Sequence, residues 1–342
     1  MKIIILGDTH FGLRNSLPVF YYHYKKFFEF FFDYLIANDI TLVVQLGDLF
    51  DNRKAINTQS LKHAKEVFFN KLQEHGIELY TLLGNHDIHL KESLLINSPE
   101  LVLNDYKNVT IFNQPTNISL GNINVDIIPW ICKENQETIL NFIENSKAKL
   151  CFGHFEIKDY PMYKNIETNS GLSRELFRNY ELVISGHYHT YSNRDNILYT
   201  GTPYQMTWQD YDDIKNFYVY DTEDNTLIAI PNPYTTFHKF IIDDTIPDIS
   251  ELDLENCFVK VMILNKETKY DSFIAELNSK SCYDIKVSEQ IVKIISANNS
   301  INIDDTPSIL NEYIEDSNIT IDKQLVKNFM SNLYLESINS GV

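Results

Sequence analysis

Five short apolar runs in the first 190 residues each lead into a glycine that is followed at once by Asp, Asn or His. Loops that leave the carboxyl ends of buried strands line the usual binding crevice, and glycine permits close backbone approach there. Two further histidines, His10 and His189, stand two residues after the first and last of these donors. We therefore predict that seven side chains converge on one site: Asp8, His10, Asp48, Asn85, His154, His187 and His189.

The chemistry of these donors predicts a pair of metal ions. Mixed Asp, Asn and His side chains suit Mn²⁺, Fe or Zn²⁺ better than Ca²⁺, and one carboxylate placed between two cations can bridge them. Two ions roughly 3.5 to 4 Å apart can clamp a phosphate, generate a hydroxide nucleophile and stabilise the entering and leaving oxygens. The pattern therefore favours phosphoester hydrolysis.

Alternating strands and helices predict a layered α/β domain over residues 1–230, and the prolines at 231 and 233 mark a connector. A small α+β unit is expected over 231–296, with a strand at 258–264, a helix at 268–277 and one or two strands within 283–295. Residues 297–342 are expected to form a linker and two amphipathic helices. Their apolar faces contain Ile309, Leu310, Tyr313 and Ile314 in one helix and Leu325, Val326, Phe329, Met330 and Leu333 in the other.

Composition narrows the possible classes of protein. No apolar run is long enough to cross a bilayer, and the start of the chain lacks the features of a signal peptide, so a cytoplasmic protein is expected. The four cysteines form no C-x-x-C pair, which argues against a zinc knuckle or a disulfide framework. The net charge of −18 argues against a broad basic surface for nucleic acid. We therefore expect weak, salt-sensitive DNA binding by the isolated chain.

The five motifs resemble those of the calcineurin-like metallophosphoesterases: Gly7-Asp8-Thr9-His10, Gly47-Asp48-Leu49-Phe50-Asp51, Gly84-Asn85-His86-Asp87, Gly153-His154 and Gly186-His187-Tyr188-His189. The resemblance implies one metal held by Asp8, His10, Asp48 and His189, and another held by Asp48, Asn85, His154 and His187. It also implies that His86 protonates the leaving oxygen or steadies the scissile phosphate, with Asp87 orienting its ring. Asp51 lies just after the bridging Asp48 and either supports a metal ligand or is a turn residue.

A later segment, Tyr199-Thr200-Gly201-Thr202-Pro203-Tyr204-Gln205, resembles the Y-x-G-[ST]-P-x-Q segment of SbcD-type double-strand-break repair nucleases. Within that family the chain resembles the small recombination-nuclease subunit of T-even-type bacteriophages. Three stretches carry the likeness: Gly47 to Ile56, Ile128-Pro129-Trp130, and Thr235-Thr236-Phe237-His238. Protein phosphatases carry a different second motif and end their third motif in Glu, whereas this chain has Asp87 there.

The SbcD-type resemblance implies a four-layer αββα sandwich, a small capping domain that touches DNA, and C-terminal helices that bind an SbcC-type coiled-coil ATPase. It implies two Mn²⁺ ions, with Mg²⁺ as a possible substitute, and exonuclease and single-strand endonuclease activity at DNA ends. The viral likeness places the chain in the cytoplasm of an infected cell. It also implies a homodimer through N-terminal helices. The aromatic residues Tyr21, Tyr24, Phe27, Phe28 and Phe31 fit either that interface or the protein's own core.

Two alternatives remain open from the sequence. A small-substrate phosphodiesterase or phosphatase would use the same metal motifs and is consistent with the acidic composition. A catalytically inactive interaction subunit is opposed by the complete set of seven donors and by His86.

Overall fold

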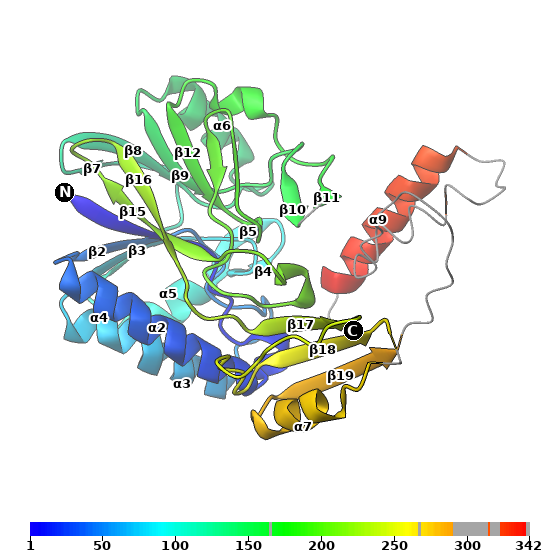
Figure 1. Ribbon diagram of the computed structural model, residues 1–342. Coiled ribbons are helices and arrows are strands. Elements are labelled where there is room, and N and C mark those ends of the chain that lie inside the picture. The colour runs from blue at the N-terminus through cyan, green and yellow to red at the C-terminus, as the bar shows by residue number, and fades with distance from the viewer. Residues whose placement is uncertain (164–165, 266–267, 290–313, 315–321, 340–342) are drawn as a thin grey trace. The chain divides into compact units, whose positions relative to one another are not determined.

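The computed structural model describes residues 1–163, 166–265, 268–289, 314 and 322–339 (Figure 1). The chain divides into two compact units, residues 1–290 and 291–342. The predicted boundary near residue 230 falls inside the first unit, and the predicted boundary at 296/297 lies six residues beyond the observed division at 290/291. Helix α9 belongs to the second unit, and the first unit contains every other element described below.

Two six-stranded sheets form the centre of the first unit. The first sheet has the order β16-β15-β1-β2-β3-β6, formed by Thr226–Pro231, Asn216–Asp221, Lys2–Leu6, Leu42–Gln45, Glu78–Leu82 and Val109–Phe112. The second has the order β13-β14-β12-β9-β8-β7, formed by Ser192–Arg194, Ile197–Tyr199, Leu182–Gly186, Leu150–His154, Ile123–Ile128 and Thr116–Leu120. The four strands β1, β2, β3 and β6 are parallel, as are β8, β9, β12 and β14.

Alternation of side chains along the strands explains why the sheets are buried on both faces. Ile3 and Ile5 of β1 pack between the two sheets against residues such as Phe152 and Ile184. Ile4 and Leu6 point to the opposite face and join the core beneath the helices. An apolar run without polar alternation is the pattern expected of such a doubly covered strand.

Helices cover the outer face of each sheet. Helix α2, Val19–Ala37, packs on the first sheet beside α3, Thr58–Ala64, a π-helical turn, Lys65–Phe69, and α4, Asn70–Glu74. Helix α6, Gln136–Asn145, and a 3₁₀ turn, Arg174–Phe177, cover the second. The four-layer αββα arrangement is thereby confirmed (Figure 1).

The aromatic face of α2 belongs to the protein's own core. Tyr24, Phe27, Phe28 and Phe31 are at most 1% exposed and pack in the core of the first sheet's outer face. Tyr21 is only partly buried against the same core. Of the two uses expected for this face, the structure supports the core and leaves these buried rings no dimer contact to make.

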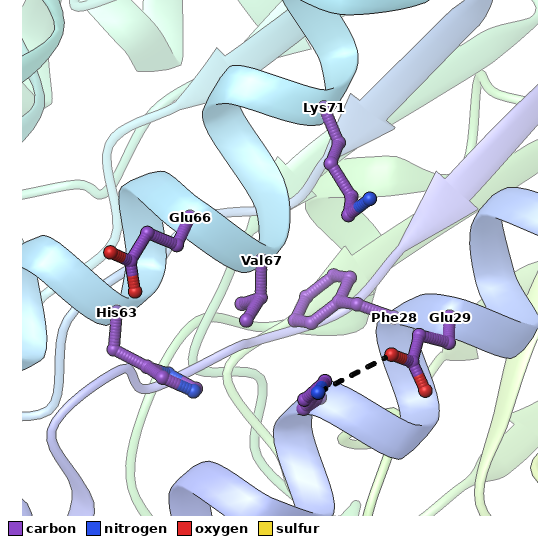
Figure 2. A pocket seen from close by; sticks show the side chains of 7 residues that line it. Phe28, Glu29, His63, Glu66, Val67 and Lys71 are labelled. Atoms are coloured by element: carbon purple, nitrogen blue, oxygen red, sulfur yellow. Dashed lines mark ion pairs between the residues drawn. The ribbon is translucent and has the colours of Figure 1, made fainter.

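A pocket of about 230 Å³ lies between α2 and the helical segment that follows it (Figure 2). It is lined by Lys25, Phe28, Glu29, His63, Glu66, Val67 and Lys71. Lys25 and Glu29 form an ion pair at its edge, with their charged atoms 3.8 Å apart. None of the predicted metal donors lines this pocket, so it is separate from the candidate site.

A third sheet follows the sandwich. Its strands β17, Phe237–Ile242, β18, Phe258–Ile263, and β19, Asp284–Glu289, are all parallel, and α7, Asp271–Ser279, packs against them over a separate apolar core. The predicted strand at 258–264 and the predicted helix at 268–277 match β18 and α7 to within a few residues. The end of the predicted 283–295 segment lies outside the described residues.

The remaining elements are short. They are α1, Leu13–Ser16, the hairpin β4, Ile88–Leu90, and β5, Ser93–Asn97, α5, Ser98–Leu103, the strands Pro161–Tyr163 and Ile166–Glu167, and a 3₁₀ turn, Trp208–Asp210. In the second unit α9 spans Lys323–Asn339, while the first predicted C-terminal helix lies outside the described residues except for Ile314. Among the described residues no helix is both long enough and apolar enough to cross a membrane.

Candidate metal centre

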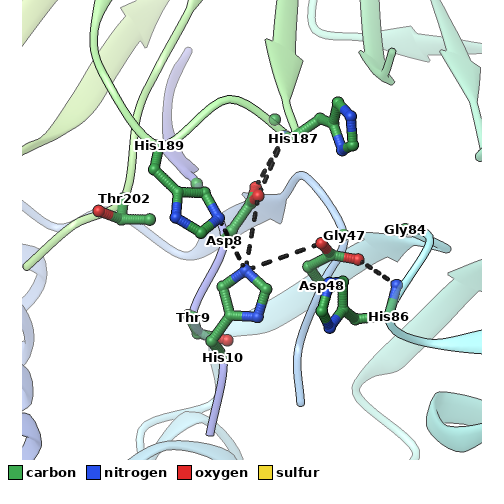
Figure 3. Close-up of polar contacts among 12 residues, drawn as sticks. Asp8, Thr9, His10, Gly47, Asp48, Gly84, His86, His187, His189 and Thr202 are labelled. Carbon is green, nitrogen blue, oxygen red and sulfur yellow. Dashed lines mark hydrogen bonds and ion pairs between the residues drawn. The ribbon is translucent and has the colours of Figure 1, made fainter. Parts of the chain in front are cut away.

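The seven predicted donors meet where five parallel strands of the two sheets end. Asp8 and His10 follow β1, Asp48 follows β2, Asn85 follows β3, and the remaining three come from β9 and from the loop after β12. Figure 3 shows the side chains of Asp8, His10, Asp48 and His189, which come from three of these segments, lying close together. The predicted convergence is therefore seen in the structure.

One group of donors consists of Asp8, His10 and His189, each with one ligand atom within 4.8 Å of the others. His10 Nε2 lies 3.2 Å from His189 Nε2 and 3.9 Å from Asp8 Oδ2. Two imidazole nitrogens and a carboxylate that point at the same small volume are a suitable donor set for a divalent cation.

The second group consists of Asp48, His154 and His187. Asn85 joins them, because its Oδ1 lies 3.0 Å from His154 Nε2 and 2.8 Å from His187 Nδ1. The amide oxygen and the two ring nitrogens again face one point.

Asp48 lies between the two groups. Its Oδ2 is 3.7 Å from His10 Nε2 and 3.4 Å from His154 Nε2, so a single oxygen borders both sets. This is the position that a bridging carboxylate requires.

The glycines of the motifs make room for donors from other motifs. A Cβ on Gly84 would lie 2.2 Å from Asp48 Oδ1, and a Cβ on Gly186 would lie 2.4 Å from Asp8 Oδ1. Neither carboxylate could keep its place beside a larger residue.

Three of the donors adopt a left-handed backbone conformation. The φ angles are 42° at His10, 53° at Asp48 and 87° at His187. Such conformations cost non-glycine residues about 1–3 kcal/mol each and cluster at functional sites, where surrounding contacts hold them. At His187 one such contact is its backbone N–H, which donates to Asp8 Oδ2 at 3.0 Å.

Burial sets the protonation of the donors. Desolvation lowers the pKa of His10 and His187 well below the usual range and lowers the pKa of His189 to about 4. These rings are therefore neutral near pH 7, which is the form that binds metal. Burial also raises the pKa of Asp8, whereas for Asp48 burial is outweighed by His154 and other nearby histidines, which hold its pKa well below the usual range.

His154 differs from the other rings. Desolvation opposes its protonation, but the adjacent carboxylates of Asp48 and Asp8 outweigh burial and raise its pKa to about 9. Its Nδ1 also lies 2.7 Å from the carbonyl oxygen of Leu46. Without a cation, this cluster therefore holds a proton at His154.

His86 stands at the edge of the same cluster. Its backbone N–H donates to Asp48 Oδ1 at 2.7 Å, and its ring Nδ1 donates to the carbonyl oxygen of Asp51 at 2.5 Å. The Asp51 carboxylate, in turn, lies 3.7 Å from His10 Nδ1. Asp51 is therefore more than a turn residue, because it contacts both histidines.

The structure changes the expected role of Asp87. Its oxygens accept hydrogen bonds from the backbone N–H groups of Asp48, Leu49 and Gly84, at 2.8, 3.0 and 2.9 Å. These contacts tie the loop after β2 to the loop after β3, whereas the His86 ring is held by Asp51. Asp87 thus supports the backbone of the site instead of orienting the His86 ring.

A buried ion pair behind His189 was not predicted from the sequence. Lys215 is 5% exposed; its Nζ lies 2.6 Å from Asp210 Oδ1 and donates to the carbonyl oxygen of His189 at 2.8 Å. Gln205 continues this support: it donates to the Asp210 carbonyl and accepts from the backbone N–H groups of Thr236 and Phe237. A lysine within an acidic stretch was the only signal in the sequence.

Comparisons with known proteins agree with this geometry. Residues 1–191 match the family described as calcineurin-like phosphoesterase. The chain is 32% identical over 341 residues to exonuclease subunit 1 of Enterobacteria phage T4, covering 98% of this chain and 99% of the relative.

Similar solved structures include a novel archaeal phosphodiesterase, with a TM-score of 0.36, 14% identity, and coverage of 68% of this chain and 99% of the other. They also include GAP50 of Plasmodium, described as the anchor in the inner membrane complex, with a TM-score of 0.42, 16% identity, and coverage of 68% and 84%. The family match spans more than half of the chain, and its five motifs are the segments that build the site. This chain belongs to the calcineurin-like phosphoesterase family.

Proposed function

We propose that the chain is a two-metal DNA nuclease. The observation that carries the proposal is the position of Asp48 between two converging donor groups. Asp8, His10 and His189 would hold one ion, Asn85, His154 and His187 the other, and Asp48 both. Bound cations of the Mn²⁺ type, with Mg²⁺ as a substitute, would supply a hydroxide nucleophile and neutralise charge on the phosphate.

His86 is proposed as the residue that protonates the leaving oxygen or steadies the scissile phosphate. Because its Nδ1 donates to the Asp51 carbonyl, the other ring nitrogen, Nε2, is the atom available for proton transfer. Asp51 acts as a positioning residue for that ring, and Asp87 acts through the backbone of the two loops.

DNA is the proposed substrate because the T4 relative is an exonuclease subunit and the similarity extends over nearly the whole of both chains. We infer exonuclease action on double-stranded ends and endonuclease action on single strands, in a recombination or repair complex. The host cell cytoplasm is the proposed location.

The third sheet is the proposed DNA-capping surface. The parallel register places Lys239 opposite Lys260, and Lys260 opposite Lys286. The three positions place lysine side chains from adjacent strands in line across the sheet, and Lys286 Nζ also lies 3.7 Å from Asp284 Oδ2. Neighbouring strands lie about 4.8 Å apart, so the row spans roughly 10 Å, enough to contact phosphates of one DNA strand. The row is also cationic in a chain whose net charge is −18.

Aromatic rings hold two of these ammonium groups toward the sandwich. Lys260 Nζ lies 4.2 Å from the centroid of the Trp208 ring, and Lys239 Nζ lies 6.0 Å from that of Tyr211. Both rings belong to the segment that leads from Gln205 to Lys215, which supports His189. The lysine row is therefore proposed to be structurally linked to the metal centre.

An SbcC-type ATPase is the proposed partner of the C-terminal helices. On α9, Leu325, Phe329 and Leu333 recur every four residues and are 65%, 59% and 43% exposed. An exposed apolar stripe of this spacing is the usual surface by which a helix docks on a coiled coil or in a groove.

A homodimer remains part of the proposal, with a different surface from the aromatic face of α2. The exposed apolar side chains Leu90, Leu95, Ile96 and Leu101 lie within twelve residues on the β4–β5 hairpin and α5, and Leu95 is 80% exposed. Exposed apolar clusters of this kind mark protein contacts. Light scattering on wild type and Leu95→Asp tests it: a monomeric wild-type chain would contradict it.

The main experiment is digestion of end-labelled duplex and single-stranded DNA with Mn²⁺ or Mg²⁺, with and without an SbcC-type ATPase. Metal-dependent shortening of the DNA is expected, together with a loss of about 10²–10⁴-fold in His86→Ala, the range for a general acid. A parallel assay with bis(p-nitrophenyl) phosphate tests the alternative, a small-substrate phosphodiesterase, which the net charge of −18 favours. Turnover of the small diester without DNA cleavage would decide for that alternative.

A further inference from the structure

Trp130 reaches the metal centre from a strand that supplies no metal donor. Strand β8 runs parallel to β9, with Ile128 opposite Gly153, so the loop after β8 emerges beside His154. The backbone of Trp130 is fixed on both sides. Its N–H donates to the carbonyl of Leu83 at 2.7 Å, and Asn135 Nδ2 donates to its carbonyl at 3.0 Å.

The indole ring contacts two of the donor histidines. Its centroid lies 5.0 Å from that of His187, with the planes inclined by 44°, and 5.9 Å from that of His154. It also packs against an apolar cluster that includes Ile88 and Leu94. These contacts fix the ring at the edge of the site.

Trp130 is nevertheless not fully buried. A partly accessible indole at the edge of this site offers a flat apolar surface that part of a ligand can cover. In a phosphodiester held by the two donor groups, the nearest apolar surface is a nucleobase, which is separated from its phosphate by one sugar ring. Aromatic side chains are the usual platforms on which bases of single strands stack.

We propose that Trp130 is the stacking platform for the nucleobase next to the scissile phosphate. The inference rests on the proposed nuclease function and adds a substrate-contacting residue to it. Every base offers a π face, so the contact is tolerant of sequence. In duplex DNA both faces of a base are covered by its neighbours, so the platform favours unpaired or frayed nucleotides.

The test combines a change in the protein with a change in the substrate, so that any coupling between Trp130 and the nucleobase can be measured. It uses the full chain with Mn²⁺. One substrate is a short single strand with one cleavable linkage; the other has abasic residues on both sides of that linkage. Wild type, Trp130→Ala and Trp130→Phe are compared by kcat/KM. Phe142→Ala, at another partly buried aromatic residue, on helix α6, which supplies no metal donor, is the matched control.

We expect Trp130→Ala to lose about tenfold on the normal strand, with Trp130→Phe retaining most of the rate. For the wild type, kcat/KM should be about tenfold lower on the abasic strand than on the normal strand. For Trp130→Ala, kcat/KM should be the same on both strands. If Trp130→Ala lowers kcat/KM relative to the wild type by the same factor on both strands, the proposal is wrong. The ring would then serve only to support His187 and His154. A wild-type chain that cleaves neither strand would refute the nuclease function itself.

Mn²⁺ titration separates the two roles independently. A stacking residue leaves Mn²⁺ affinity unchanged in Trp130→Phe and Trp130→Ala, whereas a support for the ligand rings weakens it. Thermal melting of each variant shows whether the fold is intact.

Discussion

The candidate metal centre and the lysine row of the third sheet are two charged regions built in different ways. At the metal centre, buried donors sit at the ends of strands and are held by a dense set of backbone hydrogen bonds. The row of Lys239, Lys260 and Lys286 is set by strand register, lies nearer to solvent and has aromatic neighbours. Single changes should therefore be severe at the first region and graded at the second.

The largest effect is expected for Asp48→Asn. Loss of the carboxylate that borders both donor groups should lower Mn²⁺-dependent hydrolysis at least about 10³-fold, because charge stabilisation is removed from both ions. Initial rates and the number of bound Mn²⁺ ions are the measurements. Asp105→Asn, at an exposed position, is the control and should keep full activity.

Asp87→Asn should have the next largest effect. An amide can accept at one atom only, so at least one of the three backbone N–H groups now bound to Asp87 loses its acceptor. We expect Mn²⁺ affinity and activity at low Mn²⁺ to fall about 10- to 100-fold, as for other residues behind metal ligands. Excess Mn²⁺ should restore much of the rate, whereas in His86→Ala it should not. If excess Mn²⁺ does not restore the rate of Asp87→Asn, Asp87 acts in catalysis through His86 and not only through the backbone.

The protonation of His154 should make Mn²⁺ binding depend on pH. The proton held at His154, whose pKa is about 9, must leave before that nitrogen can bind a cation. Mn²⁺ affinity should therefore rise with pH by about tenfold per unit between pH 7 and 9 and level off above. Calorimetry in buffers of different ionisation enthalpy should detect about one proton released per protein. No proton release would show that His154 is neutral in the metal-free chain.

The smallest effects belong to the lysine row. Each of Lys239→Gln, Lys260→Gln and Lys286→Gln should weaken DNA binding only a few-fold and reduce the slope of log affinity against log salt by about 0.7 to 0.9. Hydrolysis of a small diester should not change. Lys147→Gln, at an exposed position outside the third sheet, is the control. If the slope of log DNA affinity against log salt is unchanged in all three variants, the third sheet does not contact DNA.

The convergence of the seven donors was easier to predict from the sequence than the residues that support them. The donors follow apolar runs directly, so their convergence could be inferred from strand pattern alone. Asp87 and Lys215 act through backbone groups far from them in the chain, and such partners depend on loop geometry that spacing does not encode. The alignment of three lysines likewise depends on a register that the sequence leaves open.

The aromatic face of α2 shows the same limit. The aromatic pattern of α2 was equally compatible with an interface and a core, and only packing against the first sheet distinguishes them. The layered α/β fold, in contrast, could be predicted because short apolar strands alternate with helical segments over residues 1–230.

The absence of a side chain at Gly84 and Gly186 determines where substitutions can inactivate this site. A methyl group added at position 186 would displace an oxygen that belongs to residue 8, and one at position 84 would displace residue 48. Substitutions at these two glycines would thus inactivate the site although neither glycine is a metal donor. Restoring activity would require a second substitution in a distant segment. The motifs are interlocked, so each can change only as far as its neighbours allow.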